Sequence, residues 1–333
     1  RAFAGGIAAI VGSSSGPSSI ATFDAAGSAL LVRASQSLSV DAAYFSSPEP
    51  ITVVAGGREI YALFYPPTNP DSIGRDGELP PLVVVSHGGP TSRTTATFNL
   101  RLQYFTSRGI AVVDVNYGGS SGFGRAYRQR LDRSWGIVDV EDCAAVAVHL
   151  AQEGRVDRSR LAIRGSSAGG YTTLAALAFT DVFAVGSSAY GISDLRALAN
   201  DTHKFEARYL DRLVGPLPES LATYDARSPL SHADRIDCPV IFFQGLDDFV
   251  VPPQQSEVLV AALRARGIPV AYMPIEGEGH GFRHSETIVA VAEAELSFFG
   301  AVLGFLPADR LVPAPIENAS ALIARTEGAG PVN

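Results

Sequence analysis

From residue 82 onward, short apolar segments alternate with longer helical ones, and this alternation restricts the possible folds more than any other feature. The apolar segments span 82–86, 110–115, 161–164, 184–188, 240–244 and 270–275. The helical segments span 98–107, 138–152, 168–179, 253–266 and 286–303. Short, purely apolar runs are typical of strands buried on both faces. Strand and helix in regular succession predict a doubly wound, mostly parallel sheet of the α/β class.

The first fifty residues follow a different pattern, with short apolar runs separated by turn residues such as Ser-Ser-Gly-Pro. They predict three strands, at 6–11, 18–23 and 29–33. An isolated sheet of this size is marginal in water, so we expect it to lean on the following domain or on further protein. The segment 51–65 predicts a hairpin around its Gly-Gly pair.

Composition excludes several classes of function. The chain has 333 residues, with 26 basic and 34 acidic side chains and a formal net charge of −8. No Lys/Arg run forms a basic patch, which argues against nucleic acid as a partner. No uninterrupted apolar stretch suggests a membrane span. The sequence shows no metal-ligand cluster and no phosphate-binding loop, so we expect neither metal nor cofactor.

The two cysteines, Cys143 and Cys238, have the character of small buried residues, and a disulfide between them is not expected. No signal peptide is visible, so we expect a cytoplasmic protein. The chain begins with Arg1, which suggests a piece of a longer protein or a processed one.

A nucleophile motif follows the predicted strand 161–164. Gly165-Ser166-Ser167-Ala168-Gly169 is G-x-S-x-G between a strand and a helix, the context that a nucleophile elbow requires. The two glycines let strand and helix pack closely around a strained turn that exposes the hydroxyl of Ser167. A chance Gly/Ser-rich turn is the alternative, and the flanking strand and helix argue against it.

A serine hydroxyl needs a base, and the base needs an orienting acid, in the chain order Ser, Asp, His for this fold. Gly245-Leu246-Asp247-Asp248 follows one strand, and the glycine-rich segment around His280 follows the next. His280 is therefore the predicted base. Asp247 and Asp248 are adjacent, and spacing alone does not choose between them.

A further glycine pair follows the strand 82–86, in His87-Gly88-Gly89-Pro90-Thr91. Backbone N–H groups of Gly88 and Gly89, together with that of Ala168, are predicted to form an oxyanion hole. The alternative is an ordinary tight turn that ends at the proline.

Five motifs together resemble the prolyl oligopeptidase family, in its acylaminoacyl-peptidase and dipeptidyl-aminopeptidase branch, over about residues 50–305. They are HGGPT at 87–91, NYGGSSGFGRAY at 116–127, GSSAGGY at 165–171, GLDDFVVPPQQS at 245–256 and GEGHGF at 277–282. The resemblance implies an α/β-hydrolase fold and selects Asp248 as the acid. Some branches place Tyr where His87 stands, so here the resemblance implies a backbone oxyanion donor.

The same resemblance implies a domain organisation. Residues 1–50 would be the remnant of an N-terminal β-propeller, 51–307 the catalytic domain, and 308–333 an irregular C-terminal tail. In this family the propeller screens substrates by size, and a missing propeller or a partner chain could supply the rest of it. The propeller residues that hold a substrate amine in dipeptidyl peptidases would lie outside this chain.

The resemblance also suggests a specificity pocket. The stretch 202–213, with Phe205, Arg208 and Tyr209, is similar to the segment that lines the primary pocket in relatives. A helix that packs its aromatic residues into the core is an equal alternative. Tyr171, just after the elbow, is either a pocket wall or a structural support.

These observations predict a serine peptidase that acts on short peptides or on N-acylated or aminoacyl amides through an acyl-enzyme. Two alternatives stay open: an esterase or amidase that acts on small molecules, and a catalytic fragment that needs a propeller-bearing partner.

Overall fold

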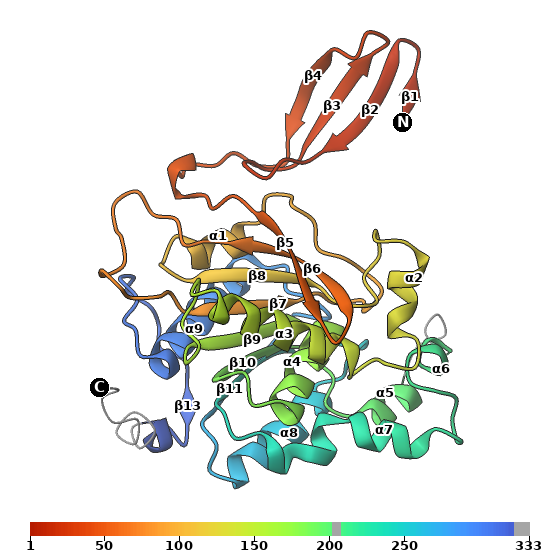
Figure 1. Cartoon of the computed structure of the whole chain (residues 1–333), viewed down its shortest axis with the longest axis vertical. Helices are drawn as coiled ribbons and strands as arrows, with labels where there is room; N and C mark the ends of the chain where they lie inside the picture. Colours follow the sequence, from red (N-terminus) through yellow and green to blue (C-terminus); the bar gives the residue numbers. More distant parts are fainter. Residues whose placement is uncertain (202–207, 323–333) are drawn as a thin grey trace.

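The computed structural model describes residues 1–201 and 208–322, in which a nine-stranded sheet forms the main body and a four-stranded sheet lies apart from it (Figure 1). The order of the large sheet is β13-β12-β11-β10-β9-β7-β8-β6-β5. In chain order its strands are β5 (Glu49–Ala55), β6 (Arg58–Tyr65), β7 (Leu82–Ser86), β8 (Ala111–Asn116), β9 (Leu161–Ser166), β10 (Val185–Ala189), β11 (Val240–Gly245), β12 (Val270–Ile275) and β13 (Ile316–Glu317).

The six central strands, β7 to β12, pair in parallel, whereas the β5–β6 hairpin and β13 join antiparallel at the two edges. Every strand predicted from an apolar run is present within two residues of its expected bounds. The prediction of a mostly parallel α/β-hydrolase sheet is confirmed. Parallel strands bring their carboxyl ends to one edge, and the loops after β7, β9, β11 and β12 meet there.

Helices cover both faces of the large sheet. One face packs against α3 (Val138–Gln152), α4 (Ala168–Phe179) and α8 (Gln254–Ala265), and the other against α1 (Leu100–Thr106) and α9 (Ser285–Leu303). Because helices bury both faces of the sheet, its central strands are rich in apolar residues on both sides. Burial of each large apolar side chain contributes about 1.5–3 kcal/mol to the free energy of folding, so the helices on the two faces hold the strand ends in place.

Several short helical segments were not predicted. They are α2 (Arg125–Arg128), α5 (Leu195–Asp201), α7 (Leu221–Arg227), and the 3₁₀ turns η1 (Ala42–Tyr44), η2 (Gln129–Leu131) and η3 (Pro229–Arg235). A helix was one of the two alternatives for 202–213, and α6 (Tyr209–Leu213) forms in the described part of that stretch. Each spans two turns or fewer, which is too short for a helical period to stand out in a sequence window.

The small sheet is an antiparallel meander of β1 (Ala2–Phe3), β2 (Gly6–Val11), β3 (Ser19–Asp24) and β4 (Ala29–Ala34). All residues of β4 are exposed, and the side chain of Leu30 is 68% accessible. The sheet touches the main body through the loop before α1, where the amide of Phe98 donates to the carbonyl of Ser13 over 2.7 Å. The small sheet therefore contacts the hydrolase but leaves most of its large apolar side chains exposed, and Ala21 is its one buried residue.

The segment after α9 differs in one respect from the predicted irregular tail. Ile316–Glu317 forms β13, which pairs antiparallel with β12. The side chain of Arg264, on α8, donates to the Glu317 carboxylate over 2.6 Å and fixes this edge. Two residues are too few for a period-2 pattern to be recognised in the sequence. None of the helices within the described ranges has the length and apolar character to cross a membrane.

Candidate active site

Ser167 lies at the sharp turn between β9 and α4. Its backbone φ is +57°, a strained value for a residue other than glycine. A Cβ atom on Gly165 would lie 2.2 Å from the carbonyl oxygen of Gly169, and one on Gly169 would lie 2.1 Å from that of Ser86. Both positions therefore require glycine, because strand and helix approach each other so closely. The local geometry is that of the elbow predicted from G-x-S-x-G.

The ring of His280 bridges two side chains from different loops. Its Nε2 lies 2.8 Å from the Oγ of Ser167, and its Nδ1 lies 2.8 Å from the Oδ2 of Asp248. A neutral imidazole with its proton on Nδ1 donates to the carboxylate and accepts the serine proton on Nε2. The loop after β9, the loop after β11 and the loop after β12 thus place an alcohol, a base and an acid in one row.

The environment of Asp248 separates it from its neighbour in sequence. Asp248 is 2% exposed, and its Oδ1 accepts the amides of Val250 and Val251, each over 2.9 Å. These two bonds orient the carboxylate so that Oδ2 faces the imidazole of His280. Asp247 is exposed, and among the described residues it is Asp248, not Asp247, whose carboxylate is hydrogen-bonded to that ring. The structure therefore brings Asp248, and not Asp247, to the histidine.

Two of the three predicted oxyanion residues lie directly beside the serine. A Cβ atom on Gly88 would stand 3.7 Å from the Cβ of Ser167, and Ala168 is the first residue of α4. Gly89 is the next residue of the same turn and is exposed. No hydrogen bond inside the described segments occupies the amides of Gly88, Gly89 or Ala168. Free amides beside a nucleophile, one of them at a helix N-terminus, favour negative charge there.

His87 is held as a neutral structural side chain. Its Nε2 lies 2.7 Å from the Oγ of Ser120 and its Nδ1 lies 2.8 Å from the carbonyl of Gly88. The ring also stacks on Tyr117 with 4.2 Å between centroids. Burial lowers the pKa of His87 to about 4, so the ring is uncharged near neutral pH. Both nitrogens are engaged, which leaves any oxyanion contact to the backbone.

The four residues predicted to bind substrate have different positions. Tyr171 is fully buried, packs on Trp135 with 4.5 Å between centroids and donates its hydroxyl to the carbonyl of Arg227 over 3.0 Å. The pocket-wall interpretation of Tyr171 is therefore corrected: its ring supports the core, because no part of it reaches solvent. Phe205 lies outside the described residues.

The other two lie on the surface near α6. The side chain of Arg208 is 92% exposed and pairs with Asp211 at 3.6 Å, so in this structure it faces solvent and not a pocket. Tyr209 reaches the turn that follows the glycine pair, where its hydroxyl lies 3.1 Å from the amide nitrogen of Thr91 and 2.5 Å from its Oγ1. Of the predicted specificity residues in the described ranges, Tyr209 alone touches the loops of the candidate site.

Two residues at the site were missed by sequence reasoning. The ring of Tyr190 packs edge-on against that of His280, with 4.8 Å between centroids, and Tyr190 has a φ of +40°. Glu278 is buried and accepts the amides of Arg283 and His284, which braces the histidine loop. The sequence did hold a sign of Tyr190's position, because it lies two residues after the predicted strand 184–188, at the edge of the sheet where the other loops meet. Glu278 carries no such signal within its glycine-rich segment.

No group of three or more His, Cys, Asp or Glu side chains suited to a metal ion occurs in the part of the chain that the structure describes.

Comparisons with known proteins identify the family of this chain. Residues 96–305, more than half of the chain, match the prolyl oligopeptidase family. Dipeptidyl aminopeptidase BIII of Pseudoxanthomonas mexicana is 33% identical over 230 residues, which cover 67% of this chain and 33% of that protein. The acylamino-acid-releasing enzyme of Arabidopsis thaliana is 30% identical over 229 residues, 64% of this chain and 29% of that protein.

A solved structure of a puromycin-hydrolysing peptidase from Mycobacterium tuberculosis is 49% identical, with a TM-score of 0.93 over 95% of this chain and 48% of that one. The chain thus spans about a third of these two curated relatives and about half of this solved structure. It belongs to the prolyl oligopeptidase family, a family of serine peptidases.

Proposed function

We propose that this chain is the catalytic part of a serine peptidase that hydrolyses short peptides or N-acylated or aminoacyl amides. The observation that carries the proposal is the hydrogen-bonded row of Ser167, His280 and Asp248, with 2.8 Å at each step. Strain at the serine and free amides beside it support the same role, since both are features of acyl transfer sites.

In the proposed reaction, the Oγ of Ser167 attacks the substrate carbonyl carbon while the Nε2 of His280 takes its proton. The negative charge that develops on the carbonyl oxygen is stabilised by backbone N–H groups of Gly88 or Gly89 and of Ala168. The imidazolium then protonates the leaving amine, and the C–N bond breaks to leave an acyl-enzyme. Water deacylates it with His280 again as the base. Asp248 keeps the proton on Nδ1 throughout.

The proposed substrate class rests on the relatives. Two of their names describe the release of a dipeptide or of an acylamino acid, and the third describes the hydrolysis of puromycin, so each names a small product or a small substrate. A fluorophosphonate probe tests the nucleophile directly: the chain should label, and Ser167→Ala should not. Absence of labelling in the folded wild-type chain would contradict the proposed nucleophile.

An esterase or amidase on small molecules would use the same triad, so substrate comparison has to decide. Turnover of an aminoacyl-nitroanilide, of puromycin and of a simple nitrophenyl ester would be measured on one preparation. The peptidase proposal expects the aminoacyl amides to be cleaved with kcat/KM values comparable to or above that of the ester. A large preference for the simple ester would favour the alternative.

We further propose that residues 1–50 belong to a β-propeller, that 51–307 form the catalytic domain and that 308–333 follow it as a tail. The exposed apolar residues of β4 and the share of the relatives that this chain spans support the first boundary. Further propeller strands, on the same or another chain, would cover β4. Activity of the chain alone on peptides of increasing length tests this: without a complete propeller, length should have little effect.

A further inference from the structure

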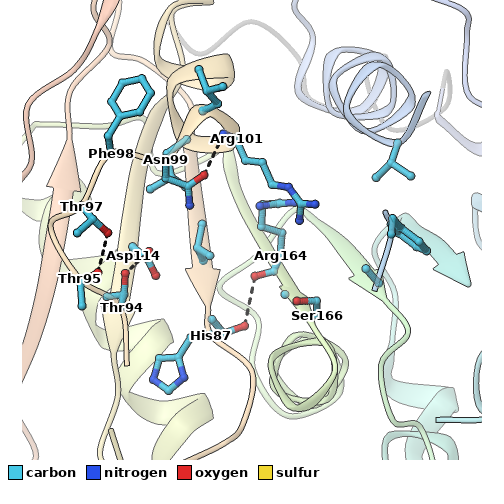
Figure 2. A pocket seen from close by; sticks show the side chains of 18 of the residues that line it. His87, Thr94, Thr95, Thr97, Phe98, Asn99, Arg101, Asp114, Arg164 and Ser166 are labelled. Atoms are coloured by element: carbon cyan, nitrogen blue, oxygen red, sulfur yellow. Dashed lines mark hydrogen bonds between the residues drawn. The ribbon is translucent and has the colours of Figure 1, made fainter. Parts of the chain in front are cut away.

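A polar cavity of about 530 Å³ lies on the α1 and α9 side of the large sheet (Figure 2). Asp114 on β8, Val85 on β7, Arg164 on β9 and Ser187 on β10 stand in one row across the sheet and line it. The loop that precedes α1 forms one wall, and Ser18 and Gln36 of the N-terminal region contribute to another. The volume lies in the range of small-molecule sites. Three arginines and two acidic residues among its lining residues make this polar cavity unusual for a sheet face covered by helices.

Arg164 is held so that part of its guanidinium stays available. Its Nε donates to the Oε1 of Glu295 over 2.8 Å, and the Oγ of Ser187 donates to the same oxygen over 2.5 Å. Glu295 is 2% exposed, so this contact fixes the arginine from the α9 side. Across the described residues no hydrogen bond engages the two terminal nitrogens of Arg164. Two parallel N–H groups of one guanidinium match the two oxygens of a carboxylate.

A second arginine enters the same space. Arg101 lines the cavity from the first turn of α1, and in Figure 2 its side chain extends toward that of Arg164. Its guanidinium makes no hydrogen bond or ion pair with the described parts of the chain. Arg101 is exposed to solvent, whereas Arg164 is paired with Glu295. A negative ligand between the two guanidinium groups would therefore be attracted by a second positive charge that no carboxylate of the described residues pairs with.

Asp114 lies in the same cavity lining. It is 7% exposed; Thr94 donates to its Oδ2, while its Oδ1 is buried without a hydrogen-bond partner. An ionised carboxylate only accepts hydrogen bonds, so Asp114 offers no donor to an anionic ligand, and the arginines supply the donors there.

The cavity adjoins the nucleophile. Ser166, next to Ser167 in the chain, lines it, and so do His87 of the oxyanion turn and Tyr190, whose ring packs on His280. A ligand with its scissile carbonyl at Ser167 would thus have the cavity beside it. Residues of the N-terminal region, Ser18 and Gln36 among them, also line the cavity.

We propose that this cavity binds the terminal carboxylate of a short peptide substrate, held by Arg164 and Arg101. The inference rests on the proposed peptidase function and adds a substrate feature to it, a free carboxyl end. A carboxylate fits better than a phosphate, because the carboxylates of Glu295 and Asp114 would repel a dianion more strongly than a monoanion.

Binding to the Ser167→Ala variant tests the inference without turnover. Calorimetry would compare trialanine with trialanine amide, which differ by one negative charge. We expect the free acid to bind at least about tenfold more tightly than the amide. Adding Arg101→Gln should reduce that ratio several-fold, whereas adding Asp114→Asn should preserve or raise it, because it removes a negative charge from the site. Arg235→Gln, at an exposed arginine outside the cavity lining, is the matched control and should keep the ratio.

Equal affinities for acid and amide, or a ratio that Arg101→Gln leaves unchanged, would overturn the proposal. Competition with acetate and N-acetylalanine tests whether the natural ligand is a separate small carboxylate. If either compound, at a concentration no higher than that of trialanine, abolishes the tighter binding of the free acid over the amide, the site does not recognise the carboxyl end of a peptide. Fluorophosphonate labelling of the wild-type chain reports separately on the proposed nucleophile. Failure of the carboxylate site would leave labelling intact, whereas failure of the proposed nucleophile would abolish it.

Discussion

The backbone of Gly245 lies against the carbonyl of Glu278, so closely that a Cβ atom on the glycine would stand 2.4 Å from that oxygen. The amide of Asp247 donates to the same carbonyl over 3.0 Å. The loop that carries Asp248 and the loop that carries His280 are therefore joined through backbone, and the separation of the carboxylate and the imidazole depends on a missing side chain.

Gly245→Ala should push these loops apart. We expect kcat/KM to fall about 100-fold, the cost of a displacement of roughly 1 Å between catalytic groups. Steady-state kinetics on an aminoacyl-nitroanilide would measure it. Gly74→Ala is the matched control, because a Cβ there meets no atom closer than 3.9 Å. Wild-type kinetics in Gly245→Ala would show that the loop contact does not position the acid and base.

The backbone strain at Ser167 predicts that two inactive variants differ in stability. Ser167→Ala keeps a Cβ at φ +57°, whereas Ser167→Gly removes it. Both should lose about 10⁴-fold or more in kcat, since the nucleophile is gone. Ser167→Gly should exceed Ser167→Ala in unfolding free energy by about 1–2 kcal/mol, because glycine accepts this conformation without strain. Urea unfolding of the two variants measures the difference, and equal midpoints would argue against a strained elbow.

The adjacent aspartates provide a third test. Asp248→Asn should lower kcat about 10⁴-fold, because an amide in place of Oδ2 favours the wrong tautomer of His280. Asp247→Asn, one residue away and exposed, should change kcat by less than a factor of about three, within the range of ordinary surface substitutions. Comparable losses in both variants would contradict the assignment of Asp248 as the orienting acid.

Most of the fold could be predicted because its central strands are largely buried and each contains a short run rich in apolar residues. That composition makes the strands visible without a partner. Elements that depend on tertiary contacts were not visible. β13 forms because Ile316 and Glu317 pair with β12 and because Arg264 binds the Glu317 carboxylate, whereas the rest of that segment is irregular.

At the candidate site, the motifs and their chain order placed Ser167 and His280 at the same edge of the sheet, since the carboxyl ends of parallel strands meet there. The choice between Asp247 and Asp248 needed either the family resemblance or the coordinates, because adjacent residues share every spacing argument. Tyr171 shows the opposite limit: its position after the elbow was read correctly as close to the nucleophile, but burial and not proximity decides its role. The cavity beside Arg164 was invisible, because its lining comes from distant segments.

The last prediction concerns the charge state of Asp114. Burial raises the pKa of this carboxyl from its ordinary value of 3.8 to about 6, against smaller opposing contributions from the Thr94 hydroxyl and Arg164. The folded state therefore binds the proton more tightly than the unfolded chain, and this group makes stability fall as pH rises from about 4 to 6. Asp114→Asn cannot ionise, so it escapes that loss.

We expect Asp114→Asn and the wild-type chain to differ least near pH 4. At pH 7 and above, the variant should be more stable by up to about 3 kcal/mol, the equivalent of a shift of about two pH units. Urea unfolding at a series of pH values from 4 to 8 measures the difference. Asp139 is also buried with a pKa raised to about 6, but it is present in both proteins and cancels. A difference that stays constant across the series would mean that the folded state does not bind the Asp114 proton more tightly than the unfolded chain does, whereas a gain confined to high pH would show that burial disfavours the ionised carboxylate.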